Sequence, residues 1–126
     1  MSTVKAANLQ NTGSGAPVFK NSSGTEIGQL AKAWVNFNGT GTVAIRDDFN
    51  VSSITDNGTG SYTVNFTTAM TDANYVCVVN AADVSDVSNL NPPAGVDRLA
   101  SSVRIDVENK NPAQHDAALI DVAIFR

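Results

Sequence analysis

The feature that most limits what this chain can fold into is a repeated pattern of short strand and turn between residues 31 and 79. Apolar and polar residues alternate over 31–37 and again over 62–66, as in a strand with one buried face. The segments between such strands are rich in Gly, Asn and Thr. Asn57-Gly58 is the strongest hairpin signal among them, because both residues tolerate positive φ. No segment shows the period and capping residues of a helix, so the pattern predicts an all-β domain.

Further strands are expected on both sides of this region. Residues 17–20 and 25–30 predict a small hairpin, and residues 103–107 and 117–125 predict two closing strands, the first alternating and the second with one apolar side. We therefore expect an antiparallel β-sandwich or a jelly-roll-like knob of about seven or eight strands. Residues 75–79 have no polar face, which predicts a central strand covered on both sides.

The chain divides by composition into two predicted parts. Residues 1–30 hold almost nothing to bury apart from the small hairpin, which is too small to be stable alone. They predict an extended N-terminal arm that contact with another chain orders. Residues 31–126 predict the β-sandwich domain.

Charge and hydrophobicity exclude several classes of partner. The net charge is −4 and the eight Lys and Arg residues are scattered singly, so a nucleic-acid partner is not expected. No apolar stretch approaches the ~20 residues of a membrane-spanning helix, and no membrane insertion is expected. The single cysteine, Cys77, excludes an intramolecular disulfide and is expected to be a buried small hydrophobe.

Candidate chemistry is sparse. His115 is the one histidine and lies in a polar connector, where a surface role is expected. Asp47 and Asp48 are the one adjacent carboxylate pair; they are expected to mark a turn, since neighbouring residues of a strand point to opposite faces. The sequence therefore predicts a protein that is not an enzyme.

Residues 80–101 lack any sustained period and predict a loop of about 20 residues, longer than most structureless loops. Asp83, Asp86 and Asp97 are hard oxygen ligands that calcium prefers, but their spacing matches no calcium-loop motif. A loop without bound metal is expected, and no cofactor is predicted.

Trp34 lies on the strand face opposite Ala33, Val35 and Phe37. Its indole is expected to pack in the core or in a subunit contact, rather than to form a platform for a sugar with Tyr62.

Ordered strings of residues resemble the C-terminal domains of bacteriophage tail fibres and the segments that precede those domains. KAWVNFNGTG at 32–41 carries the resemblance most closely, and nothing beyond residue 79 shares it. The other strings are NLQNT (8–12), APVF (16–19), GTEIG (24–28), VAIR (43–46), FNVSSITDNGTG (49–60), YTVNF (62–66) and NY (74–75).

This resemblance implies a homotrimeric virion structural protein, made in the bacterial host cytoplasm and located in a tail fibre or on the capsid surface. Residues 1–30 would attach to other virion proteins, and the knob would bind a glycan or protein of the host surface. Fibres usually carry long N-terminal shafts, whereas this domain begins by residue 31. A capsid decoration or head-fibre protein without a receptor role is therefore the alternative, and a glycan-hydrolysing fibre tip is the third.

Two sets of contact residues follow. The candidate host-binding residues lie in the unpatterned loop and are Asp83, Asp86, Asn89, Asn91, Asp97 and Arg98. The candidate trimer or anchor contacts are apolar residues of the arm together with the tryptophan: Val4, Leu9, Val18, Phe19, Ile27, Leu30 and Trp34.

Overall fold

The computed structural model describes residues 6, 8–10, 12–13, 17–82, 87–91, 97–109 and 113–126, and for 87–91 it describes the backbone. The chain separates into two compact units, Met1–Leu30 and Ala31–Arg126. Every regular element in the described residues is a β-strand, and every strand pair is antiparallel. The predicted all-β class is confirmed.

The first unit contains a short hairpin of β1 (Phe19–Lys20) and β2 (Glu26–Gly28). Asn21 holds its turn, because the Oδ1 atom accepts hydrogen bonds from Ser23 N at 3.1 Å and from Thr25 N at 2.9 Å. An asparagine side chain that bonds backbone two to four residues ahead stabilises a turn without help from packing. The turn is therefore set locally, whereas its two strands are only two and three residues long.

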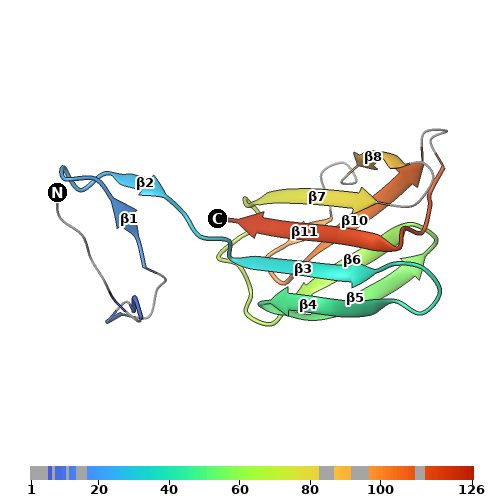
Figure 1. Cartoon of the computed structure of the whole chain (residues 1–126), viewed down its shortest axis with the longest axis horizontal. Coiled ribbons are helices and arrows are strands. Elements are labelled where there is room, and N and C mark those ends of the chain that lie inside the picture. Colours follow the sequence, from blue (N-terminus) through green and yellow to red (C-terminus); the bar gives the residue numbers. More distant parts are fainter. Residues whose placement is uncertain are drawn as a thin grey trace. The chain divides into compact units, whose positions relative to one another are not determined.

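The second unit consists of two antiparallel sheets arranged as a β-sandwich. Figure 1 shows them as a front layer in the order β4-β3-β11-β7 and a back layer in the order β5-β6-β10-β8, with β9 also pairing with β10. The front strands are β3 (Ala33–Asn38), β4 (Ala44–Phe49), β7 (Val76–Ala82) and β11 (Leu119–Phe125). The back strands are β5 (Val51–Gly58), β6 (Ser61–Phe66), β8 (Val87–Asn91), β9 (Arg98–Leu99) and β10 (Ser102–Asn109).

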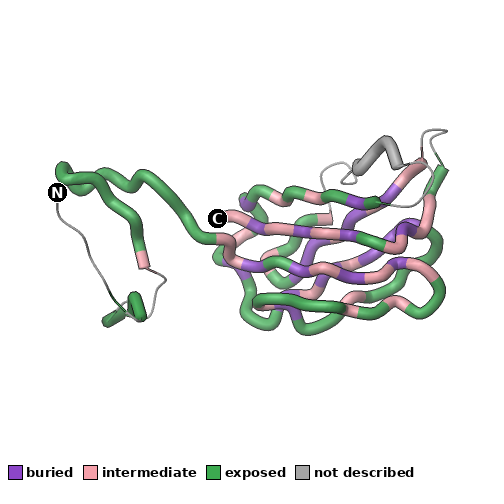
Figure 2. Tube along the Cα trace, viewed as in Figure 1, coloured by how far each residue is buried: buried purple, intermediate pink, exposed green. Residues whose placement is uncertain are grey.

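One hydrophobic core lies between the two sheets. Burial alternates along β3, β6, β10 and β11, as Figure 2 shows for the front strands, so every second side chain points inward. The two aromatic pairs of the core meet edge to face, with ring centroids 5.3 Å apart for Phe37 and Tyr62 and 5.8 Å apart for Phe66 and Tyr75. The inward residues predicted for residues 31–37, 62–66 and 103–107 are confirmed.

A polar cluster joins the loops at one end of the sandwich. The fully buried Tyr62 places its hydroxyl 2.9 Å from Gly39 O and 2.8 Å from Asp116 Oδ1. The same carboxylate oxygen accepts a hydrogen bond from Gly60 N at 2.7 Å. Burial, together with the neighbouring Asp116 carboxylate, raises the pKa of Tyr62 well above its usual value, so the phenol stays protonated and can donate. The cluster holds together three segments that are far apart in sequence.

The opposite corner, where the chain crosses between the sheets, depends on Asn50. This residue is the single link between β4 and β5 and has a φ of +57°. Its side chain donates to Lys32 O at 2.9 Å and Thr68 O at 3.1 Å, and its Oδ1 accepts from Thr68 N at 2.7 Å. Asparagine is one of the few residues that adopt this backbone conformation readily, and here its amide also satisfies the surrounding backbone.

The predicted position of the strand at residues 75–79 is wrong. β7 forms one end of the four-stranded sheet, and its only described strand partner is β11. Val76 and Val78 face away from the core and are 59% and 53% exposed, while Cys77 and Val79 pack against it half-buried. An edge strand that is apolar on both faces has the same sequence pattern as a central one, so the pattern could not separate the two.

Two other expectations are also corrected. Asp47 and Asp48 lie within β4, where a β-bulge opposite Asn36 and Phe37 accommodates Arg46; they do not form a turn. The segment 80–101 is not one loop, because β7 extends to Ala82 and both β8 and β9 lie inside it. The hairpin expected at Asn57-Gly58 is present, although the turn itself falls at Thr59-Gly60 because β5 runs on through Gly58.

Candidate interaction surface

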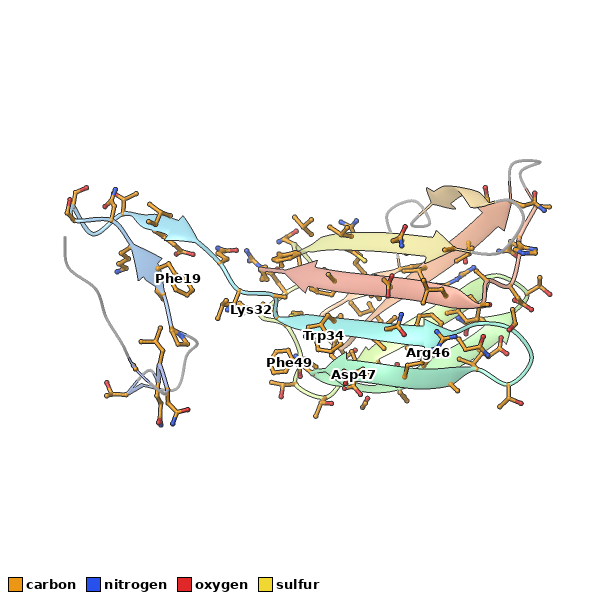
Figure 3. All side chains as sticks on the ribbon, viewed as in Figure 1. Phe19, Lys32, Trp34, Arg46, Asp47 and Phe49 are labelled. Carbon is orange, nitrogen blue, oxygen red and sulfur yellow. The ribbon has the colours of Figure 1, made fainter. Side chains whose placement is uncertain are left out.

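The outer face of the four-stranded sheet carries a row of apolar side chains that runs from one edge to the other. Trp34 on β3 lies directly opposite Phe49 on β4 and Ala123 on β11, and Ala123 lies opposite Val78 on β7. Figure 3 labels Trp34 and Phe49 side by side on this face. The next register position adds a neighbouring pair, Val76 and Phe125. We call these six residues the apolar band: Trp34, Phe49, Val76, Val78, Ala123 and Phe125.

A row of polar residues lies beside the apolar band. Asn36 Nδ2 donates to Asp121 Oδ1 at 2.6 Å, and Asn80 Nδ2 donates to Asp121 Oδ2 at 3.3 Å. Arg46 reaches across β3 and donates from Nη2 to Ala118 O at 2.6 Å. These contacts cross all four strands of the sheet. The side chains of this polar row, Asn36, Arg46, Asn80 and Asp121, are thus hydrogen-bonded within the sheet, and these bonds link its four strands next to the apolar band.

A shallow depression of about 300 Å³ lies between the two rows. Its walls come from the central strands and from β7: Trp34, Val35, Asn36, Val78, Asn80, Asp121, Val122 and Ala123. The lining therefore includes Trp34 and Val78 from the apolar band, and Asn80 and Asp121 from the polar row. An apolar hollow with polar groups on one side can receive a side chain or a small ligand.

The outer face of the other sheet has a different character. Its rows consist of Ser, Thr and Asn, with Ser53 opposite Asn65 and Thr55 opposite Thr63. Asn65 Nδ2 donates to Ser53 Oγ at 3.1 Å and to Thr55 Oγ1 at 3.0 Å. Arg104 continues this polar face, with Nη2 3.4 Å from Asp106 Oδ1. The described side chains of this face are polar, in contrast to the apolar band.

The predicted host-binding residues are only partly within the described residues. Asp83 and Asp86 lie outside them, and Asn89 and Asn91 fall in β8, whose backbone alone is described. Asp97 Oδ2 lies 3.6 Å from Arg104 Nη1, and Arg98 Nη1 donates to Tyr75 O at 3.4 Å. The two residues with described side chains therefore already have partners within the sandwich.

The predicted trimer or anchor residues expose much apolar surface. Ile27 is 67% exposed, and Leu9, Val18, Phe19 and Leu30 are also exposed. Trp34 is 37% exposed, and Val4 lies outside the described residues. None of the described residues of the first unit buries Leu9, Val18, Phe19, Ile27 or Leu30. Phe49, Val76 and Val78 on the sandwich are also exposed. The sequence pattern places them in strands and predicts no contact for them.

Reactive groups do not gather on the described surface. No group of three or more His, Cys, Asp and Glu residues that could hold a metal ion occurs there. His115 N donates to Val107 O at 2.9 Å in the connector before β11. Burial raises the pKa of the Cys77 thiol to about 11, so it stays protonated at neutral pH and is a poor nucleophile. No helix in the described residues is long and apolar enough to cross a membrane.

A second hollow, of about 270 Å³, lies near the Asn50 corner and is largely polar. Its basic residues are Lys32 and Arg126. The Arg126 guanidinium is paired with the Asp72 carboxylate, with Nη2 2.5 Å from Oδ2, and this contact holds the pKa of Asp72 below its usual value. Asn50 and Arg126 already bond to neighbouring groups of the protein. We therefore attribute this hollow to the way the chain crosses between the sheets at Asn50 and assign no ligand to it.

No protein-family model, no curated protein and no solved structure matches the chain.

Proposed function

We propose that this chain is a bacteriophage virion structural protein, a non-enzymatic fibre-type knob that self-associates as a homotrimer. Residues 1–30 attach it to the particle, and the β-sandwich is the part presented to the host surface. The observation that carries the proposal is the exposed apolar surface of the first unit, where Ile27 and Leu30 are exposed together with Val18 and Phe19.

The hairpin of the first unit cannot bury this apolar surface by itself. A two-stranded hairpin is at best marginally stable in water, and here the strands are two and three residues long. Its Asn21 turn nevertheless defines one conformation. A segment with a set turn and unburied apolar side chains becomes stable when several copies, or a receiving protein, cover those side chains. This property fits an arm that trimerises and anchors.

The surface chemistry of the sandwich supports the same proposal. Charged residues are 16% of the chain, below the average of roughly 25%, and the outer face of the five-stranded sheet is a hydroxyl and amide surface. A surface of hydroxyl and amide groups can contact host glycans through hydrogen bonds. Asp97, Arg98 and the rest of segment 80–101 remain the proposed host-facing region.

The full chain is expected to have three times its 13.1 kDa mass in solution at micromolar concentration, as measured by multi-angle light scattering. Ile27→Glu should shift the mass toward the monomer, because a charge in an apolar contact must be desolvated. Ser22→Glu adds the same charge to the exposed turn of the same hairpin and should leave the mass unchanged. A monomeric wild-type chain would contradict the trimer.

The location of the protein tests the virion assignment. Gold-labelled antibody against the chain is expected to bind intact phage particles, at the tail fibre tips for a fibre knob. Label confined to the capsid would instead identify a decoration or head-fibre protein. Particles that carry no label, although the antibody detects the protein in the infected cell, would contradict a virion role.

A further inference from the structure

We propose that the apolar band on the four-stranded sheet packs against another copy of this chain. The proposal rests on the self-association proposed above and assigns the surface of the sandwich at which the copies meet.

The distribution of exposed hydrophobic side chains points to this face. Within the described part of the second unit, large hydrophobic residues that remain exposed are Trp34, Phe49, Val76, Val78, Leu99 and Leu119. All of them except Leu99 lie on the outer face of the four-stranded sheet. The described outer rows of the other sheet, on β5 and β6, are polar. Such a contrast between two faces of one sandwich marks one of them for contact with protein rather than with water.

The size of the band agrees with a protein interface. With exposed fractions between 37% and 59%, Trp34, Phe49, Val76 and Val78 together expose an area on the order of 400 Å². A standard interface buries roughly 800 Å² on each partner, a little over half of it apolar. The band therefore supplies most of the apolar part of one such interface. A bound sugar ring would cover Trp34 and its depression but would leave Phe49 and Val76 in water.

The edge of the sheet also favours a protein chain. β7 contains no charged residue and no proline from Val76 to Ala82, and no described strand pairs with its outer side. Proteins usually protect such edges with charges or bulges, as β4 does with Arg46, Asp47 and its bulge. A strand edge without a described partner, beside an apolar band, is stable when a neighbouring copy covers both.

Trp34 is the single tryptophan of the chain, so its fluorescence reports on this face alone. In the full chain, acrylamide should quench Trp34 weakly at concentrations where light scattering shows the assembled protein. On dilution, quenching should increase at least twofold at the same concentration at which the mass falls. This measurement needs no variant.

Val78→Glu places a charge in the band without touching the core and should raise the dissociation constant at least 100-fold. Thr55→Glu is the matched control, because Thr55 is also exposed and outward-facing on an edge strand, but on the polar face. It should leave the mass unchanged. Circular dichroism of both variants checks that the sandwich is folded.

Three results would overturn the proposal. An assembled protein in which Trp34 is as open to acrylamide as in the monomer would leave self-association standing but move the interface elsewhere. Shielding of Trp34 only on addition of lipopolysaccharide would place a glycan on the band instead. A wild-type chain that stays monomeric would contradict both this proposal and the trimer.

Discussion

Replacing Gly60 by alanine should lower the free energy of unfolding by about 3–4 kcal/mol, the sum of a backbone cost and a steric cost. Gly60 has a φ of +67°, which costs an alanine roughly 1 kcal/mol. A Cβ atom would also lie 2.5 Å from both His115 N and Val107 O, which bond to each other at 2.9 Å. These are backbone atoms, so neither can rotate away, and β10 must move from the connector that precedes β11.

Gly41 supplies the matched control, since its φ is +63° and a Cβ there would meet no atom within 4 Å. Gly41→Ala should therefore show the backbone cost of about 1 kcal/mol alone. Urea denaturation followed by circular dichroism, at one fixed protein concentration, measures both variants. Equal losses for the two alanines would show that the close approach at Gly60 relaxes freely.

Removing the hydroxyl of Tyr62 should cost about 2 kcal/mol, because Tyr62→Phe removes the one O–H donor that the buried Gly39 O and the partly buried Asp116 Oδ1 share. In this variant Asp116 Oδ1 keeps the hydrogen bond that it accepts from Gly60 N. Tyr62→Ala should cost about 4 kcal/mol or more, since it also removes a fully buried ring that packs on Phe37.

Thr63→Val is the control for this pair, because Thr63 follows Tyr62 on β6 and points to the polar outer face. It loses one exposed hydrogen bond from Asn57 and should change stability by no more than about 0.5 kcal/mol. Urea midpoints of all three variants give the comparison. A Tyr62→Phe loss as small as that of Thr63→Val would mean that the cluster at this end does not stabilise the sandwich.

Local alternation predicted the core well where each strand has one polar face. In β3, β6 and β10 the inward residues are those expected, because a period of two determines which side chains share a face. The same rule failed at β7, where both faces are apolar. An exposed apolar face and a core face are built from the same residue types, so the pattern of Val76 and Val78 predicts burial, whereas both are exposed.

The unpatterned segment 80–101 shows a second limit. β8 and β9 are strands because β10 pairs with both of them, not because their own residues alternate. β4 is a similar case. The sequence predicts a turn at Asp47 and Asp48, but the strand continues through both residues and contains a bulge at Arg46. From there Arg46 donates a hydrogen bond to Ala118 O. Pairing with a distant strand can impose extended structure that local propensity does not signal.

The sequence by itself determined that the chain is all-β, where most strands lie and which of their side chains point inward, because these properties depend on the alternation of neighbouring residues. Only the tertiary structure decided which strands share a sheet, that β7 lies at an edge, and that Trp34, Phe49 and Val78 form one apolar band. It also brought Asp116 to Tyr62, 54 positions away. The reason is physical: strand order and register arise from pairings between distant segments, and the period of a single strand carries no information about its neighbours.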